Sequence, residues 1–365
     1  MRRLILLLGL LLVGALVAGS SAKPKPKPFA VTNNVSVYGA WHCGSDFCTW
    51  ASIRNMTDFD ARNRWLIDRG DGSPSVNLVV LSFVQPLKLL NKTNDAGTSQ
   101  GVPIGMNQAV VDYFKSRGVR VQLSIGGITY VDAWNQALST NPTQLGLNAA
   151  EAAQRLGVGI EIDYEENTNP NLVGLQAFIN AYRSVLPYDA SGNNHAARLT
   201  IDLASGDRWL IALTRKATAD WLNTTTPVLD YANAMVASRQ ANSAAAAQAD
   251  WQEHIDGKPQ FAPPILPLAP AKFTGSLYIV TGTRAAPECT SFSSSLTNST
   301  GLYVQTVAPN GAGTTSGMLG YMFWAAECPS TRRVCTVPPN SCEGGVGVGA
   351  DTYNIPIPMA ALRQS

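Results

Sequence analysis

Charged residues are scarce in this chain of 365 residues, where they make up 14% of the sequence and leave a formal net charge of +2. Such a near-neutral balance gives no electrostatic case for a nucleic-acid partner. The sequence has no basic patch with interleaved aromatic residues either. Hydrophobic residues make up 45% of the chain, which is enough for a well-packed core, and the length suits a single α/β barrel. These features indicate a globular protein that does not bind nucleic acid.

Long apolar runs are also missing, apart from one at the start of the sequence. Residues 1–22 join a short basic segment, an apolar run over 4–18 and small residues over 20–22. This is the pattern of a secretory signal peptide, because the run is too short to span a bilayer and no stop-transfer pattern follows it. The Lys-Pro repeat within residues 23–33 predicts an extended spacer. We therefore expect a secreted, extracellular protein with no membrane partner.

Six cysteines fit an oxidising compartment. Cys43 and Cys48 are close enough in the sequence to close a small loop, although a zinc site that adds His42 is an alternative. The other four are left for two further bridges, whose pairing the sequence does not fix: Cys289, Cys328, Cys335 and Cys342. We expect residues 328–365 to form a cysteine-containing tail. Five sequons suit glycosylated surface loops: Asn34, Asn55, Asn91, Asn223 and Asn298.

Segments typical of strands and of helices alternate along residues 34–327. Near-continuous apolar runs such as 76–84 and 119–123 are typical of strands covered on both faces. About eight strands alternate with helices, which implies parallel βαβ units and favours a closed (β/α)8 TIM barrel. An open doubly wound sheet lacks support, since no Gly-x-Gly-x-x-Gly turn follows the first strand and no Walker-type loop is present. Other expected elements are helices over 49–68 and 209–221, a loop over 87–105 and a strand over 228–236.

The segment 157–166 carries three acids at alternate positions, namely Glu161, Asp163 and Glu165. Because side chains alternate along a strand, we expect all three on one face, with Glu166 pointing away from them. Repulsion would push their pKa values apart, which is the usual way to obtain a proton donor beside an anion. An acidic, solvated edge strand is the alternative. The two preceding glycines and the apolar surroundings favour a buried parallel strand, where such acids are costly unless they have a function.

Two adjacent strand ends carry a known combination of motifs. The segment 124–127 reads Ser-Ile-Gly-Gly, and 159–165 reads Gly-Ile-Glu-Ile-Asp-Tyr-Glu. Together they resemble glycoside hydrolase family 18, the chitinase family, which has Ser-x-Gly-Gly on its third strand and Asp-Gly-x-Asp-x-Asp-x-Glu on its fourth. Residues 229–235 resemble the sixth strand of that family, and 320–324 resemble the eighth, which ends in a tryptophan under the sugar. The resemblance covers roughly residues 35–324 and implies a TIM barrel.

The resemblance also implies a substrate-assisted, retaining hydrolysis of β-1,4-linked N-acetylglucosamine. Glu165 would be the general acid, and Asp163 would orient the substrate's acetamido group. Glu161 stands where the family has an aspartate and is expected to be a third catalytic acid that shares a proton with Asp163. The alternatives are that its extra methylene pushes Asp163 out of position, or that it is a structural hydrogen-bond partner. The expected partner is chitin or another oligosaccharide that contains N-acetylglucosamine, bound by a monomer without a cofactor or a metal ion.

The remaining expected site residues surround these acids. Trp324, Tyr38, Phe83 and Met235 are predicted to bind the sugar, since aromatic faces suit sugar C–H groups. Plain barrel packing is an alternative for Tyr38 and Phe83, and Trp41 and Trp134 are left open between core, rim and sugar-binding positions. Ser124, Gly126 and Gly127 are expected to shape the space beneath the acids.

Several positions depart from the family pattern. Val158 and Glu161 stand where the family has aspartates, and Ala237-Ser238 replace the Tyr-Asp that follows the methionine of the sixth strand. The missing tyrosine helps to hold the acetamido group in the family, and Tyr130 or Asp202 could substitute for it. These departures leave open a second hypothesis, a chitinase-like lectin with little or no turnover. A third hypothesis, a metal-dependent barrel enzyme with the three acids as ligands, does not explain the Ser-Ile-Gly-Gly turn or Trp324.

Overall fold

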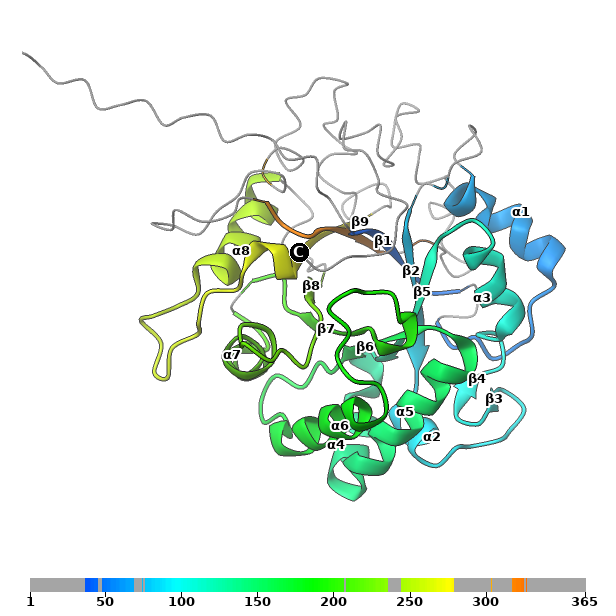
Figure 1. Ribbon diagram of the computed structural model, residues 1–365, viewed down its shortest axis with the longest axis horizontal. Coiled ribbons are helices and arrows are strands. Elements are labelled where there is room, and N and C mark those ends of the chain that lie inside the picture. Colours follow the sequence, from blue (N-terminus) through cyan, green and yellow to red (C-terminus); the bar gives the residue numbers. More distant parts are fainter. Residues whose placement is uncertain are drawn as a thin grey trace, which may run out of the picture. The chain divides into compact units, whose positions relative to one another are not determined.

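The computed structural model describes residues 37–44, 48–68, 74, 76–206, 208–235, 244–278, 303, 317–324 and 326 (Figure 1). The expected leader, spacer and C-terminal tail lie outside these residues. So do Ala237, Ser238 and the four cysteines that follow Cys48. Within the described part of the chain, no helix is both long and apolar enough to cross a membrane.

Eight parallel strands form a closed barrel, which confirms the predicted (β/α)8 fold. Around the ring the order is β1-β10-β9-β8-β7-β6-β5-β2. The first and last barrel strands in the sequence, β1 and β10, therefore pair with each other and close the ring. The strand bounds are β1 Val37–His42, β2 Leu78–Val84, β5 Arg120–Gly126, β6 Gly159–Asp163, β7 Leu199–Leu203, β8 Ala232–Ala234, β9 Phe273–Tyr278 and β10 Gly320–Trp324.

Helices surround this barrel (Figure 1). The α-helices are α1 Met56–Ile67, α2 Pro86–Leu90, α3 Gln108–Lys115, α4 Val131–Thr140, α5 Pro142–Leu156, α6 Leu172–Val185, α7 Ile211–Lys216 and α8 Ala244–Asp256. Shorter elements are the 3-10 turns η1 Ile128–Tyr130, η2 His195–Ala197 and η4 Pro270–Lys272, the π-helix η3 Ala217–Leu222, and the antiparallel pair β3 Thr98–Ser99 and β4 Val102–Pro103.

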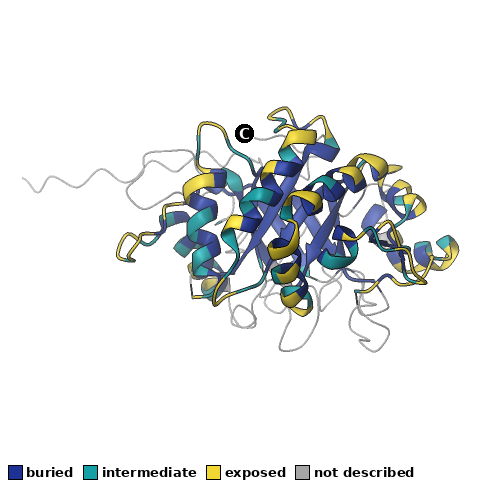
Figure 2. Cartoon of the chain, turned by 90° about the horizontal axis from the view of Figure 1, so that it is seen from below, coloured by how far each residue is buried: buried dark blue, intermediate teal, exposed yellow. Residues whose placement is uncertain are grey.

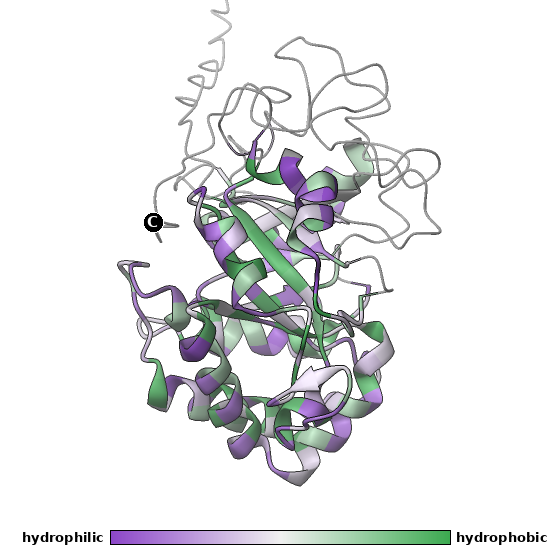
Figure 3. Ribbon diagram, turned by 90° about the vertical axis from the view of Figure 1, so that its right-hand side faces the viewer, coloured by the Kyte–Doolittle hydropathy of each residue, from purple (hydrophilic) through white to green (hydrophobic). Residues whose placement is uncertain are grey.

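The hydrophobic core has two layers. The larger layer lies between the outer faces of the strands and the helices, and the smaller one fills the barrel interior around Trp41, Val80 and Met322. Figure 2 shows the strands buried in the middle and the outer faces of the helices exposed. Figure 3 shows hydrophobic strands beside helices of mixed hydropathy. Strands covered on both faces explain why the near-continuous apolar runs predicted them.

Asparagine residues set where four of the helices begin. The Asn55 side chain accepts hydrogen bonds from the Thr57 and Asp58 backbone N–H groups, and equivalent caps precede α3, α5 and α6 at Asn107, Asn141 and Asn171. Such a cap satisfies N–H groups that have no partner within the helix. The helix predicted over 49–68 therefore starts only at Met56.

Three other element predictions need correction. The expected loop over 87–105 contains most of α2 and the β3–β4 pair, and the helix over 209–221 divides into α7 and η3. The strand over 228–236 is reduced to β8, because Asp230 is used elsewhere. Its carboxylate binds Arg183 (Oδ2 to Nη2, 3.0 Å) and Arg198 (Oδ1 to Nη1, 2.8 Å), and it accepts from the Leu199 backbone N–H (2.6 Å). This buried cluster lies where β7 and β8 begin, at the barrel end opposite the site.

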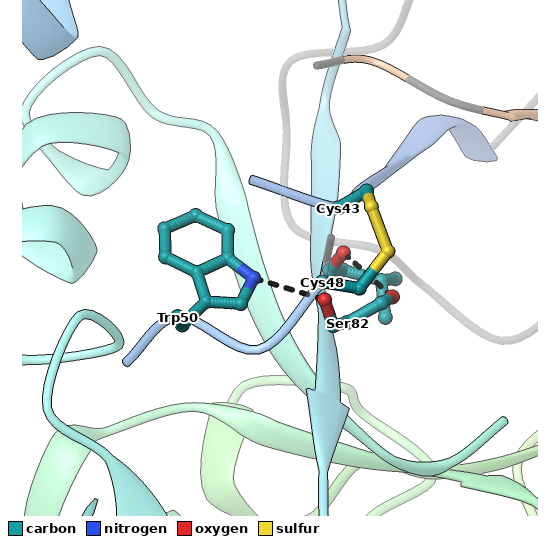
Figure 4. Close-up of a disulfide and its surroundings, with 5 residues drawn as sticks. Cys43, Cys48, Trp50 and Ser82 are labelled. Carbon is teal, nitrogen blue, oxygen red and sulfur yellow. Dashed lines mark hydrogen bonds between the residues drawn. A yellow bond between two sulfur atoms is a disulfide. The ribbon is translucent and has the colours of Figure 1, made fainter. Parts of the chain in front are cut away.

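Cys43 and Cys48 form a disulfide, as the sequence predicted (Figure 4). Their sulfur atoms are bonded to each other, so the alternative of a zinc site at these residues is wrong. The Cys48 carbonyl accepts from the Phe83 backbone N–H (3.1 Å), and the Trp50 indole N–H donates to the Ser82 carbonyl (2.9 Å). The disulfide loop is thus attached to the end of β2.

Candidate active site

A pocket opens where the barrel strands end, which is the edge that carries the active site in TIM-barrel enzymes. Side chains from six strands or the residues directly after them line it, together with Ile128 of η1. The lining residues are Trp41, Phe83, Ile128, Asp163, Glu165, Asp202, Met235 and Trp324. The structure therefore brings together five of the residues that the sequence predicted for the site. It also places there Trp41 and Asp202, which were left open, and Ile128, which was not considered.

Glu161 lies at the base of the site and is fully buried. One carboxylate oxygen accepts from the Trp41 indole N–H (Nε1 to Oε1, 2.9 Å), and the other accepts from the Asn233 amide (Nδ2 to Oε2, 2.7 Å). Burial raises the pKa of Glu161, and the hydrogen bonds from Trp41 and Asn233 act in the opposite direction. Glu161 thereby connects β6 with β1 and β8 across the barrel interior.

Asp163 and Glu165 follow Glu161 at intervals of two residues, towards the mouth of the pocket. Asp163 is 3% exposed. Burial, and then the charges of Glu165 and Glu161, raise the pKa of Asp163 well above its usual range. Glu165 is half-buried. Burial raises its pKa to about 7, although hydrogen bonds from the Ile128 backbone N–H and from Asp163 oppose that rise. A carboxyl group with this pKa can both donate and accept a proton near neutral pH.

Glu166 points away from this row, as predicted. Its carboxylate accepts from the backbone N–H groups of Thr168 (2.7 Å) and Asn169 (3.1 Å) and from the Asn135 side chain (3.2 Å). These hydrogen bonds lower the pKa of Glu166. Two adjacent glutamates therefore have opposite pKa shifts, because one is buried among acids and the other lies in a loop rich in N–H donors.

The Ser-Ile-Gly-Gly turn allows β5 to approach the acidic strand closely. Gly126 has φ of +126°, and a Cβ atom there would lie 1.8 Å from the Asp163 carbonyl oxygen. That oxygen accepts from the Gly127 backbone N–H (3.1 Å) and from the Trp134 indole N–H (3.1 Å). Ser124 pairs in register with Glu161. These contacts fix the end of β6, and they place Trp134 in the core rather than in the pocket.

An aromatic wall faces the acids. Phe83 and Trp324 are stacked with ring centroids 5.9 Å apart and an interplanar angle of 25°. Trp41 lies 6.5 Å from Trp324, and it also donates to Glu161. Both Phe83 and Trp324 remain partly exposed, so their faces are available to a ligand. Such a wall beside carboxyl groups suits a ligand with apolar C–H faces and polar groups, as sugars have.

The prediction that Tyr38 binds substrate is corrected by its position. Its ring is 1% exposed and packs 5.0 Å from Phe323 and 6.2 Å from Tyr321, between the barrel and the helices. Because side chains alternate along β1, Tyr38 faces the opposite side from Trp41, which lines the pocket. Of the two roles left open for Tyr38, sugar binding and barrel packing, the structure therefore shows barrel packing.

Asp202 lies at the end of β7 and is 2% exposed. Of the two substitutes considered for the missing tyrosine, Asp202 lines the pocket, whereas Tyr130 is not among the lining residues. The available signal was an acid near the end of an apolar strand.

Within the described residues, no group of three or more histidine, cysteine, aspartate or glutamate side chains could hold a metal ion.

The sequence matches no family model, and no curated protein matches it. Solved structures do resemble the chain. A family 18 chitinase from Cycas revoluta, in complex with allosamidin, is 13% identical with a TM-score of 0.46, and the match covers 83% of this chain and 98% of that chain. A family 18 chitinase from Pseudoalteromonas aurantia is 12% identical (TM-score 0.42; 68% and 86% covered). A chitinase from Rhizomucor miehei is 13% identical (TM-score 0.44; 72% and 93% covered). Because so few positions are identical, the roles of individual residues rest on this chain's own motif and pocket.

Proposed function

We propose that this chain is a chitinase-like glycoside hydrolase that cleaves β-1,4-linked N-acetylglucosamine. The observation that carries the proposal is the position of Glu165, whose pKa is raised to about 7, two residues after a buried aspartate and opposite an aromatic wall. The motif that places these acids is the one that resembles family 18.

In the proposed mechanism, Glu165 protonates the oxygen of the glycosidic bond while the substrate's own acetamido carbonyl oxygen attacks the anomeric carbon. The bond to the leaving sugar breaks, and a cyclic oxazolinium ion forms. Asp163 accepts from the acetamido N–H and stabilises the positive charge. Glu165 then removes a proton from the incoming water, whose oxygen attacks the same carbon. The bond between that carbon and the acetamido oxygen breaks, and the acetamido group is restored. This substrate-assisted route retains the configuration and needs only one enzyme carboxyl as acid and base.

The departures from the family pattern fall on residues other than this pair. Val158 is buried and does not line the pocket. Glu161 is longer than aspartate, but its oxygens are held by Trp41 and Asn233. We therefore favour turnover over a binding function alone.

We also propose that the protein is secreted. The sequence pattern of residues 1–22 supports this proposal, and so does the disulfide between Cys43 and Cys48, because such bonds persist in oxidising compartments.

The test is hydrolysis of N-acetylglucosamine oligomers by the wild type, Glu165→Gln and Glu166→Gln, with binding followed by calorimetry. We expect the wild type and Glu166→Gln to turn over equally and Glu165→Gln to bind without turnover. The Glu166 variant is a matched control, since the same change is made one residue away, outside the pocket. Binding without turnover in all three proteins would indicate a lectin instead, and equal turnover in all three would remove Glu165 from its role.

A further inference from the structure

Glu165 lies just beyond the part of β6 that the neighbouring strands hold. The pairing of β6 with β5 ends at Asp163, which lies opposite Gly126, and its pairing with β7 ends at Ile162. Tyr164 and Glu165 therefore pair with no residue of the described strands. Contacts outside the sheet must set the position of the proposed acid.

The side chain of Tyr164 reaches the helices that cover this strand. Because side chains alternate along an extended chain, it points away from the side that carries Glu165. Its ring is fully buried and packs on Trp134 of α4, with ring centroids 5.6 Å apart. Its hydroxyl group donates to the side-chain oxygen of Asn135, also on α4, and accepts from the Asn171 backbone N–H (2.9 Å), directly before α6. One hydroxyl group thus joins the segment that carries Glu165 to two helices.

A rigid link of this kind matters because the Glu165 carboxyl group must reach the glycosidic oxygen. A misplacement of about 1 Å can cost about 100-fold in rate. On the pocket side, the carboxyl group accepts a hydrogen bond from the Ile128 backbone N–H. That contact holds the end of the Glu165 side chain, whereas Tyr164 holds the backbone that carries it.

We propose that the Tyr164 hydroxyl group positions the proposed general acid, because it ties the unpaired segment after β6 to α4 and α6. This inference rests on the proposed function and adds a positioning residue to it. Without the hydroxyl group, the segment can move towards the pocket mouth, and the Glu165 carboxyl group moves with it. A carboxyl group that moves towards the mouth regains water, so its pKa falls from about 7 towards the ordinary value of 4.5.

The experiment follows hydrolysis of N-acetylglucosamine oligomers by the wild type, Tyr164→Phe and Tyr182→Phe from about pH 4 to about pH 9. Phenylalanine keeps the ring and removes only the hydroxyl group. Tyr182 is the matched control, since it is also fully buried. Its hydroxyl group donates to the carbonyl groups of Ala196 and Arg198, which lie where β7 begins, at the barrel end opposite the pocket. Thermal unfolding of each protein checks the fold.

Asn135→Ala is a second route to the same change, and it replaces Tyr164→Phe if that variant does not fold. Asn135 lies on α4 and is partly exposed, and alanine is favourable in a helix. The Asn135 amide also donates to Glu166 (3.2 Å). Glu166→Gln acts on that contact and leaves both hydrogen bonds of the Tyr164 hydroxyl group in place, so it remains a control for turnover.

We expect Tyr164→Phe to lower kcat by about 10- to 100-fold and to leave KM within about threefold, since the aromatic wall stays in place. The alkaline limb of kcat/KM should move to lower pH by about one unit or more, because this limb reports the pKa of the acid in the free enzyme. Asn135→Ala should act in the same direction but less strongly, since the hydrogen bond from Asn171 remains. Tyr182→Phe should lower the unfolding temperature and leave kcat, KM and the alkaline limb unchanged.

Four results would overturn the inference. Unchanged kcat in Tyr164→Phe, or a lower kcat with the alkaline limb at its wild-type pH, would give Tyr164 a structural role only. An equal loss of kcat in Tyr182→Phe would assign the loss to general destabilisation. The proposed function would stand in all three cases, because the wild type is active. An inactive wild type would instead overturn the proposed function, and this inference with it.

Discussion

At the scale of a single residue, burial changes the pKa of the Glu165 carboxyl group. The carboxyl group lies half-buried at the pocket mouth, and burial raises its pKa to about 7. In the unfolded chain the same group has a pKa near 4.5. The folded state therefore binds a proton more tightly than the unfolded state does. Between these two pKa values the unfolded chain gives up its proton first, and the stability of the fold decreases as the pH rises.

This relation predicts that Glu165→Gln stabilises the protein above the lower pKa. An amide does not titrate, so the free energy of unfolding of the variant should exceed that of the wild type by about 1–3 kcal/mol at pH 8. The difference should shrink towards zero as the pH falls to about 4.5. Urea denaturation at several pH values measures it. Glu166→Gln is the control, and the opposite sign is expected for it, because its pKa is lowered in the fold. A pH-independent difference for Glu165→Gln would contradict the raised pKa.

Residue-scale predictions from the sequence succeeded where the information is local. Glu161 and Asp163 lie on β6 and Glu165 follows two residues beyond its end, so their common side follows from the period of an extended chain alone. Asp202 lies on another strand, and its position beside Asp163 depends on the register between β6 and β7, which no local pattern encodes. Tyr38 was left open between sugar binding and barrel packing, and the structure shows packing, since the phase of β1 is fixed by contacts that its own residues do not specify.

At the scale of the structural elements, the last residue of β5 accepts no side chain without a shift of β6. A side chain at Gly126 would collide with the Asp163 carbonyl oxygen, and its φ of +126° is unfavourable for residues other than glycine. Gly118 also has a positive φ, of +75°, but an added Cβ there would meet nothing within 4 Å. A comparison of alanine substitutions at these two glycines therefore distinguishes the cost of backbone strain from the cost of a steric clash.

We predict that Gly126→Ala destabilises the fold by more than about 3 kcal/mol, whereas Gly118→Ala costs about 1 kcal/mol. Both variants are destabilised by an alanine with positive φ. Only Gly126→Ala must also displace the backbone of β6, and this causes the difference. Urea denaturation of the two variants and the wild type measures it. Equal losses would mean that β6 can move away without cost.

The loop between β1 and α1 offers a second prediction at this scale. The Cys43–Cys48 disulfide closes a short loop, and the Cys48 carbonyl accepts from the Phe83 backbone N–H. Replacing both cysteines by serine should lower the free energy of unfolding by about 2 kcal/mol, according to the loop-entropy relation for so short a loop. It should also weaken oligosaccharide binding, since Phe83 forms part of the aromatic wall. Denaturation and calorimetry measure the two effects, and loss of stability without loss of binding would show that Phe83 is held by other contacts.

The elements themselves were predictable to different degrees. Long strands of the barrel are apolar on both faces and produce a strong signal. The segment 87–105 was taken as a loop because its polar and glycine residues hide the short helix α2 and the β3–β4 pair. The strand predicted from 228 onwards is shorter because Asp230 turns to two arginines that lie 32 and 47 residues away in the sequence.

For the molecule as a whole, the two ends of the barrel have opposite electrostatic character. At the end where the strands begin, Asp230 is paired with Arg183 and Arg198. Where the strands end, the buried acids Glu161, Asp163 and Asp202 form no ion pair among the described residues. In TIM barrels the first end usually serves stability and the second serves function.

Asp230→Ala should therefore destabilise the protein by about 3–5 kcal/mol, since two buried guanidinium groups lose their partner. Removing the exposed partner of a surface pair, as Lys88→Ala does for Asp95, should cost less than about 1 kcal/mol. Denaturation measures both. At a temperature where both variants are folded, kcat should be unchanged in each. A lower kcat in folded Asp230→Ala would show that the two ends of the barrel are coupled.

Closure of the ring through β1 and β10 has a consequence for how the protein is made. Trp41 and Trp324 line the pocket from β1 and β10, which are the first and last barrel strands in the sequence and pair with each other. A nascent chain on the ribosome contains the whole acidic strand long before β10 is synthesised, yet it lacks one side of the aromatic wall. Capture on immobilised oligosaccharide would then select chains in which synthesis and folding are both complete. The time at which a new chain first binds the oligosaccharide would therefore measure when the last step of barrel assembly occurs.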